Sequence, residues 1–392
     1  MATEQRIYFD HNATSPLRPE ARSAMLSAFD QSGNASSVHA EGRRARGMLD
    51  HARESVASMC GASARDVIFT AGGTEANNLA LTRSLLIEGD RRPVTRCVIS
   101  SVEHVCVLDG HRFPSDRVET LVVDANGIVS ADALSEQLTR ISQQDGRALV
   151  AIQAANSETG VLQPIAELSQ LVHRHGGLLH CDAVQAAGKL PLDQITAGAD
   201  MVALSAHKIG GPQGVGALVL RSGGISIADK MMRGGGQERG ARGGTENVAG
   251  IVGFGAAAQA VMSSLRIEAA NYQDWRDAVA AAVIKLCPEA MIFGANVARL
   301  PNTLAFAVPG LTAEMALMGF DLAGVALSSG SACSSGKVKR SHVLDAMGVA
   351  PDMVSGAIRV SFGWTNSAEE VIRFASIFET LIERMMKRSR AA

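Results

Sequence analysis

An apolar run leads into a lysine in the stretch Met201-Val202-Ala203-Leu204-Ser205-Ala206-His207-Lys208, and glycines follow at once. A run this short and this uniformly apolar is typical of a parallel strand that is covered on both faces. Lys208 would then lie where a buried strand ends in a tight turn. Desolvation lowers the pKa of a lysine, and a partly neutral amine can form a Schiff base. The alternative for Lys208 taken alone is a solvated residue at a strand end.

An aspartate ends a similar run upstream, Leu178-Leu179-His180-Cys181-Asp182. A lysine and an aspartate at the ends of neighbouring strands suit pyridoxal phosphate, which needs an imine partner and an anion beside its pyridinium nitrogen. Gln185 follows closely and could hydrogen-bond the oxygen on the ring. The alternative for Asp182 is again a solvated strand end.

Polar residues follow three further apolar runs in the same way. In open parallel sheets, ligands bind in the crevice at the carboxyl ends of the strands. Each residue alone has an ordinary explanation: His104, for example, is either a structural histidine or an imidazole that stacks on a flat ring or relays protons. Together they favour one ligand site at this edge of the sheet. The residues are Thr74 after the run 67–70, His104 after 97–100 and Asn156 after 149–153.

Composition narrows the class of protein. The chain has 392 residues, more than the roughly 250–300 at which a single core stops growing, so two domains are expected. The net charge of −2 gives no electrostatic case for binding nucleic acid or an anionic membrane. Six scattered cysteines favour reduced thiols over disulfides or a zinc site, and the N-terminus has no apolar signal segment. These features predict a cytoplasmic enzyme, with residues 247–265 as a buried helix rather than a membrane span.

The spacing of the apolar runs predicts an α/β fold. Residues 16–260 are expected to form a large cofactor-binding domain around a parallel sheet. Residues 1–15 and 261–392 are expected to form a small domain, in which helical patterns dominate. Ser367 and Glu370 have the spacing of a capping box at the start of a C-terminal helix that docks on the core. The runs expected as strands are 67–70, 97–100, 149–153, 178–181, 201–205 and 217–220.

Two glycine-rich segments are candidate anion-binding loops. Residues 71–76 read as a strand end, a glycine turn and a helix start, where Gly73 and Thr74 could bring backbone amides to a phosphate. The alternative is an ordinary turn in which Thr74 caps the helix. Residues 234–247 are either a flexible surface loop or a loop shaped around an anion, with Thr245 leading into the next helix.

Cys333 lies in a run of small polar residues, 328–336, that cannot bury it. Cysteine is among the most buried residue types, and the basic residues that follow favour the reactive thiolate. We therefore expect a reactive thiol on a loop at about residues 328–341. Arg359 interrupts an apolar run, 357–361. It is interpreted either as a bidentate grip on a substrate carboxylate or as half of a buried salt bridge.

These motifs together resemble the cysteine desulfurase family, pyridoxal-phosphate enzymes of the class V aminotransferase group. The resemblance covers nearly the whole chain in order, and the motif that ends in Cys333 is its most specific part. It implies fold type I, the aspartate-aminotransferase-like fold, with a large parallel-sheet domain and a smaller α+β domain. The matching stretches are 8–14, 33–37, 73–75, 103–104, 156–160, 182–185, 205–208, 237–240, 244–247, 329–333 and Arg359.

The resemblance also implies roles around the cofactor, pyridoxal 5'-phosphate. Lys208 would hold it as a Schiff base and later move protons. His104 would stack on its ring, Asp182 would pair with its nitrogen and Gln185 with its phenolic oxygen. The remaining cofactor-binding set would be Gly73, Thr74, Asn156, Ser205, His207 and, from the neighbouring subunit of a homodimer, Thr245.

On the substrate side, the resemblance implies that Arg359 and Asn156 hold the carboxylate of L-cysteine. Cys333 would take the sulfur as a persulfide and release L-alanine. The loop around Cys333 resembles the longer-loop branch of the family, which hands sulfur to an iron–sulfur scaffold protein. No intrinsic metal is implied, and Cys333 would at most share a cluster transiently with the scaffold. His11, Ser157 and Trp364 depart from the common pattern and bear on partner choice and tuning.

Three alternatives to cysteine desulfuration stay open. A selenocysteine lyase and an aminotransferase use the same fold and cofactor site. A non-catalytic sulfur or metal carrier would use Cys333 as a ligand, and the set formed by Asp182, Gln185 and Lys208 argues against it.

Overall fold

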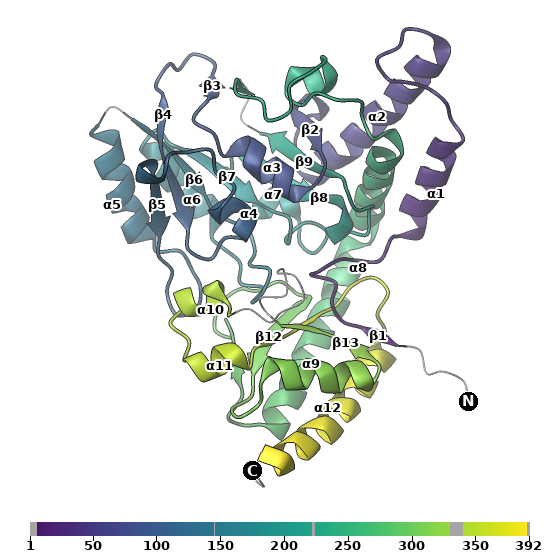
Figure 1. The fold of residues 1–392 in the computed structure, drawn as a ribbon, viewed down its shortest axis with the longest axis vertical. Helices are drawn as coiled ribbons and strands as arrows, with labels where there is room; N and C mark the ends of the chain where they lie inside the picture. The colour runs from purple at the N-terminus through teal and green to yellow at the C-terminus, as the bar shows by residue number, and fades with distance from the viewer. Residues whose placement is uncertain (1–5, 145, 222–223, 330–339, 390–392) are drawn as a thin grey trace.

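The computed structural model describes residues 6–144, 146–221, 224–329 and 340–389. Figure 1 shows a larger upper part built on one wide sheet and a smaller lower part that holds the last helices of the chain. Cys333 lies outside the described residues.

The wide sheet has seven strands, in the order β2-β9-β8-β7-β6-β4-β5. All six apolar runs singled out in the sequence form strands of this sheet, and the expected α/β fold is confirmed. The strand that the sequence did not reveal is β5, at the edge. The bounds are β2 Val67–Thr70, β4 Val94–Ser100, β5 Val118–Leu121, β6 Arg147–Ala151, β7 Leu178–Asp182, β8 Met201–Ser205 and β9 Gly216–Leu220.

One strand runs against the others. β9 pairs antiparallel with both β8 and β2, so the expectation that the run 217–220 is a parallel strand is wrong. The physical reason is the connection from β8 to β9, which comprises only residues 206–215. A parallel partner needs a crossover of a dozen or more residues, usually with a helix, to return to the same end of the sheet.

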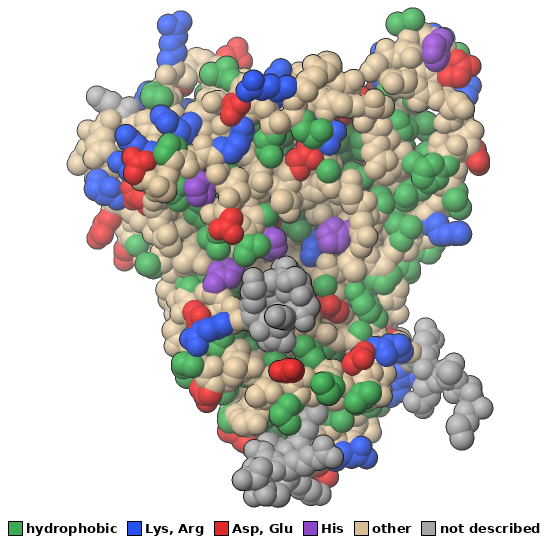
Figure 2. Space-filling view, in the orientation of Figure 1, with side chains coloured by type: hydrophobic (Ala, Val, Ile, Leu, Met, Phe, Trp, Pro, Cys, Tyr) green, Lys and Arg blue, Asp and Glu red, His purple; other side chains and the backbone are tan. Residues whose placement is uncertain are grey.

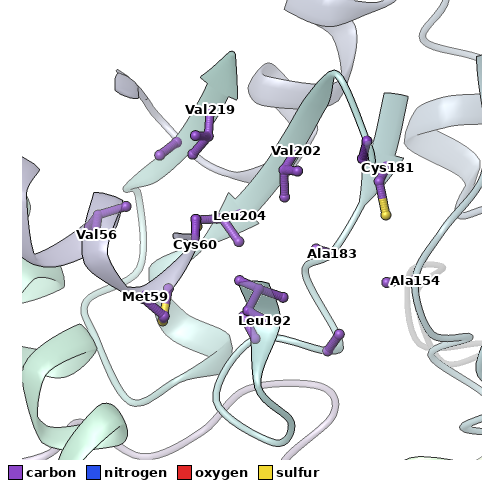
Figure 3. Close-up of a cluster of buried hydrophobic side chains, with 14 of the residues drawn as sticks. Val56, Met59, Cys60, Ala154, Cys181, Ala183, Leu192, Val202, Leu204 and Val219 are labelled. Carbon is purple, nitrogen blue, oxygen red and sulfur yellow. The ribbon is translucent and has the colours of Figure 1, made fainter. Parts of the chain in front are cut away.

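Successive side chains of the central strands point to opposite faces of the sheet and pack into different hydrophobic clusters. These runs are therefore apolar throughout. In β8, Val202 and Leu204 belong to one buried cluster, and Met201 and Ala203 belong to another on the opposite face. Figure 3 shows the first cluster, where Val202, Leu204 and other strand residues meet side chains of α2 and α7. Covering both faces keeps the sheet rigid and leaves its strand ends to carry a site.

The helices of the upper part cover both faces of the sheet (Figure 1). Helix α8 packs against α1 and α2 and extends down to α12. It is long and apolar enough to cross a membrane by length and composition, and half of its most apolar window is buried inside the fold. The bounds are α1 Pro19–Phe29, α2 Ala40–Met59, α3 Gly73–Ala80, α4 Val105–Leu108, α5 Ala131–Ser142, α6 Ile165–Arg174, α7 Leu192–Ile195 and α8 Val248–Leu286.

The lower part contains a second, four-stranded sheet in the order β11-β12-β15-β14. This sheet agrees with the smaller α+β domain that the family resemblance implies, although its strands were not among the apolar runs singled out in the sequence. A capping box starts α12, since the Glu370 amide donates to Ser367 Oγ and the Ser367 amide donates to Glu370 Oε2. The bounds are β11 Met291–Ile292, β12 Thr303–Ala307, β14 Ser328–Ser329, β15 Ile358–Ser361, α9 Ala313–Leu322, α10 His342–Ala346, α11 Pro351–Ser355 and α12 Ala368–Ser389.

Short elements complete the fold. β1 pairs with β13 in parallel and thereby ties the N-terminal segment to the lower part, while β3 pairs with β10. The bounds are β1 Ile7–Tyr8, β3 Leu85–Ile87, β10 Ile225–Ile227 and β13 Val325–Ala326, with 3-10 turns at Ala64–Asp66, Ser115–Arg117, Ala206–Lys208 and Gln237–Gly240.

Candidate cofactor and substrate site

A cleft of about 880 Å³ lies where the strand ends of the wide sheet face β15 and the N-terminal segment. Figure 2 shows histidine side chains gathered in the middle of this face, where the upper and lower parts meet. The structure thus brings most of the candidate residues together. Those that line the cleft are Gly73, Thr74, His104, Asp182, Gln185, Ser205, His207, Lys208 and Arg359.

Lys208 is half-buried at the end of the 3-10 turn that follows β8. Its Nζ donates to the backbone oxygens of Asn12 at 2.5 Å and Ala13 at 3.0 Å. Both carbonyls come from the N-terminal segment, which therefore closes one side of the cleft. Lys208 is accordingly held by the fold, unlike the solvated strand-end lysine that was the alternative.

Both oxygens of the Asp182 carboxylate are oriented by donors. Oδ1 accepts from the Val184 amide at 3.0 Å, and Oδ2 accepts from Asn77 Nδ2 at 2.8 Å. Asn77 Oδ1 in turn lies 2.7 Å from Nε2 of His180. Burial lowers the pKa of His180 to about 3, so the ring is neutral and donates from Nε2. His180 therefore fixes the Asn77 amide, and Asn77 fixes Asp182.

His104 follows β4 and caps α4. Its Nδ1 accepts from the Cys106 amide at 3.1 Å, so a neutral His104 ring carries its proton on Nε2. Cys106 Sγ accepts from Asn77 Nδ2 at 3.3 Å, and both residues line the cleft. One hydrogen bond thus sets the tilt of the imidazole, as a ring that stacks on a ligand requires.

The glycine turn after β2 starts α3 at the rim of the cleft. Gly72 is the capping residue and forms no side-chain bond, so the alternative in which Thr74 caps the helix is wrong. A Cβ atom on Gly73 would lie 2.8 Å from Val184 Cγ2, and one on Gly216 would lie 2.4 Å from the Gly72 carbonyl carbon. Only glycine lets the backbone approach this closely, and the first amides of α3 remain available to an anion.

His207 lies between this turn and Lys208. Its Nδ1 shares a hydrogen bond with Thr14 Oγ1 at 3.1 Å. Burial, with the positive charges of Lys208 and Lys189, lowers the pKa of His207 to about 4. At neutral pH this histidine is therefore uncharged and can act as a hydrogen-bonding group.

Arg359 reaches the cleft from β15. Its Nη2 lies 2.8 Å from Asp10 Oδ1, and its Nη1 donates to the Ser157 oxygen at 3.0 Å. Both interpretations from the sequence therefore meet in one residue, because the buried ion pair exists and the guanidinium also lines the cleft. Its buried Nε has no partner among the described residues, which leaves a donor for a ligand.

A family model described as aminotransferase class-V matches residues 7–374. A cysteine desulfurase of Cereibacter sphaeroides is 38% identical over 388 residues, which cover 97% of this chain and 97% of the relative. The chain belongs to the cysteine desulfurase branch of the aminotransferase class-V family. An IscS-like cysteine desulfurase of Mycobacterium tuberculosis is also 38% identical, with 98% of each chain covered. A solved NifS-like protein from Rickettsia africae superposes with a TM-score of 0.82 at 32% identity, covering 97% of this chain and all of that one.

Two residues that the sequence places at the site, Asn156 and Thr245, do not line the cleft. Asn156 is buried, and its Oδ1 accepts from Thr159 and from the Glu158 amide while its Nδ2 donates to the Val102 oxygen. Its side chain thus shapes the turn after β6. Thr245 lines a separate hollow beside Gly244 and Arg242.

Several lining residues were not reached from the sequence. They come from the N-terminal segment, from α3 and α4, and from loops. Asn12 belongs to a stretch that carried the family resemblance and Gln153 ends a run expected as a strand, whereas for the others the sequence held no signal of its own. They are Asn12, Asn77, Cys106, Gln153, Gln213 and Met231.

Proposed function

We propose that this chain is a pyridoxal-phosphate-dependent cysteine desulfurase that moves the sulfur of L-cysteine to Cys333 and releases L-alanine. The observation that carries the proposal is the cleft itself, in which Lys208, Asp182 and Arg359 converge from three different elements. The relatives described as cysteine desulfurases, which match over nearly the whole chain, support the same reaction.

The residues of the cleft fit pyridoxal phosphate. A buried carboxylate suits a pyridinium nitrogen, the start of α3 with its close-packed glycine turn suits a phosphate, and an amine suits an aldehyde. The residues that would hold it are Asp182, Gln185, His104, Lys208, Gly73, Thr74, Ser205 and His207. When bound, the cofactor supplies an electron sink next to the substrate carbon.

The chain supplies the positions and the protons. Arg359 would bind the substrate carboxylate through its buried guanidinium, whose Nε is still without a partner among the described residues. Lys208, once released from its carbonyl partners, would take and return a proton at the substrate carbon. His104, oriented by the Cys106 amide, would relay a proton on the opposite side.

Sulfur transfer falls to Cys333. Its thiolate forms a bond to the substrate sulfur, the carbon–sulfur bond breaks, and the electron pair stays on carbon, which is protonated to give alanine. β14, which ends at Ser329, pairs with β15 so that Ser328 lies opposite Arg359. The described chain before Cys333 therefore ends beside the residue proposed to bind the substrate carboxylate, which supports this role.

We further propose a cytoplasmic homodimer in which Thr245 reaches the cofactor phosphate of the neighbouring subunit. The position of Thr245 outside the cleft of its own chain is compatible with this arrangement. An iron–sulfur scaffold protein is the proposed sulfur acceptor.

Product analysis tests the reaction. The purified chain, loaded with pyridoxal phosphate and supplied with L-cysteine and a thiol reductant, is expected to form alanine and sulfide in equal amounts. Keto acid instead of alanine would identify an aminotransferase. Turnover of selenocysteine with little turnover of cysteine would identify a selenocysteine lyase. Absence of cofactor absorbance would indicate a non-catalytic sulfur carrier.

A further inference from the structure

A second lysine lies beneath the cleft, and the mechanism above does not use it. Lys189 is 4% exposed. Its Nζ donates to the backbone oxygen of Gln185 at 2.9 Å and to Gln185 Oε1 at 3.1 Å. Among the residues that the structure describes, no carboxylate forms an ion pair with it. A buried cation without an anionic partner is costly for a fold, so its presence points to the adjacent site.

Lys189 decides which way the Gln185 amide faces. In its protonated form Lys189 can only donate, so the amide oxygen of Gln185 faces Lys189. On the other side, Gln185 Nε2 donates to the backbone oxygen of Asn12 at 2.9 Å, and a carbonyl can only accept. The two constraints agree. They leave the second N–H of the Gln185 amide, which lines the cleft, for a ligand.

The surroundings of Lys189 are positive. Burial is the main cause that lowers its pKa to about 7, and the charges of Lys208 and Arg359 act in the same direction. The charge of Lys189 is in turn felt by two histidines, His11 and His207, whose pKa values are lowered. Arg18 lines a small adjoining hollow together with Lys189, and Arg18 already forms an ion pair with Glu268. An anionic ligand would therefore be the natural counter-charge.

We propose that Lys189 is a positioning residue for the cofactor: it fixes Gln185 so that an N–H donor, and not the amide oxygen, faces the anionic ring oxygen of pyridoxal phosphate. The inference rests on the proposed cofactor and goes beyond it, because it assigns a role to a residue outside the cleft. Without Lys189 only the Asn12 carbonyl, among the described residues, still orders the Gln185 amide, so its donor toward the ring oxygen is held less firmly and the ring oxygen loses a nearby positive charge.

The test compares variants loaded with pyridoxal phosphate. The visible absorbance of the bound cofactor changes with pH as the Schiff-base nitrogen between Lys208 and the cofactor titrates. In Lys189→Met the midpoint of this change is expected to rise by about one pH unit, because a positive charge near that nitrogen is lost. The affinity of the apoprotein for pyridoxal phosphate is expected to fall roughly tenfold, as for one lost hydrogen bond to a charged group. Lys189→Gln, which keeps a donor but no charge, is expected to lie between wild type and Lys189→Met.

Lys285→Met is the matched control, because it removes the same charge from an exposed position of α8. It is expected to keep the wild-type midpoint and affinity. A folded Lys189→Met protein with the wild-type midpoint and affinity overturns the proposal. Should Lys189→Met not yield folded protein, an unchanged midpoint in Lys189→Gln overturns it equally. A wild-type chain that takes up no pyridoxal phosphate would overturn the proposed function and this inference together, whereas the first two outcomes overturn the inference alone.

Discussion

Each oxygen of the Asp182 carboxylate receives one hydrogen bond from within the fold. The donor on Oδ2, Asn77, is fully buried and is itself fixed by His180. A residue inside α3, which does not follow a strand, thus orients the carboxylate proposed to pair with the cofactor.

Asn77→Leu is expected to remove the donor from Asp182 and to leave the N–H of His180 buried without a partner. Each unsatisfied buried group costs about 1–3 kcal/mol, so the free energy of unfolding should fall by that order and the affinity for pyridoxal phosphate should fall with it. Urea denaturation and cofactor titration measure both. Asn271→Leu, at an exposed position of α8, is the control, and an equal effect there would contradict the orienting role.

Lys208→Ala tests the lysine that is proposed to carry the proton. The side chain is only half-buried, and its Nζ donates to two backbone carbonyls of the N-terminal segment, so its replacement should leave the fold intact. Alanine formation is expected to fall by at least about 10²–10⁴-fold, the usual contribution of a positioned proton carrier. Circular dichroism and alanine quantification check the two statements. Alanine formation at the wild-type rate would rule out Lys208 as the proton carrier.

At this scale, sequence reasoning reached the residues that directly follow strands. Lys208 and Asp182 were found because an apolar run ends beside each of them. Asn77 was not found, since its contact with Asp182 spans 105 positions of the chain, and a single sequence gives no sign of such a pairing. Asn156 was expected to bind a ligand, but its side-chain oxygen already accepts hydrogen bonds from two amides of its own turn.

The glycine turn between β2 and α3 illustrates the scale of elements. Gly72 and Gly73 are neighbours, yet a Cβ on Gly72 would meet nothing within 4 Å while one on Gly73 would collide with Val184. The turn is therefore fitted to the segment that follows Asp182, and this contact joins the proposed phosphate-binding turn to the carboxylate proposed for the pyridinium nitrogen.

Gly73→Ala is expected to lower the free energy of unfolding by about 1–3 kcal/mol, because the added Cβ would crowd Val184 Cγ2 and force that side chain to shift. Gly72→Ala, whose backbone is extended and whose surroundings are open, is expected to change it by less than about 0.5 kcal/mol. Urea denaturation of the two variants side by side measures the difference. Equal destabilisation by both substitutions would refute the packing account.

Among the elements, the run 201–205 and its neighbours were predictable because covered strands are apolar on both faces. The direction of β9 was not, since it depends on the length of a connection and not on the strand residues. The small sheet was expected only in outline, from the α+β domain that the family resemblance implies. Its outer strands, β11 and β14, have two residues each, too few to show a pattern, whereas the inner strands, β12 and β15, are as long as strands of the wide sheet but were not singled out.

For the whole molecule, the buried Lys189 predicts how stability depends on pH. Its pKa falls from 10.5 when exposed to about 7 in the fold. Between these values the unfolded chain binds a proton that the folded chain does not, so the contribution of Lys189 to folding stability rises with pH across this window and is most unfavourable below it. At about 1.4 kcal/mol per pKa unit, the effect is on the order of a few kcal/mol.

Lys189→Met is therefore expected to be more stable than wild type at pH 6 and to lose this advantage by about pH 10. Urea denaturation of both apoproteins at several pH values measures the difference in unfolding free energy. A difference that stays constant with pH would mean that Lys189 is not titrated by folding.

The central claim concerns the whole reaction, in which sulfur leaves L-cysteine for Cys333. The most direct measurement is to incubate the cofactor-loaded protein with sulfur-labelled L-cysteine, quantify alanine in a single turnover and locate the label by peptide mass spectrometry. One alanine is expected for each persulfide on the peptide that contains Cys333, and Cys333→Ala is expected to keep the cofactor absorbance while forming neither. Alanine and a protein persulfide formed at the normal rate by Cys333→Ala would contradict the account.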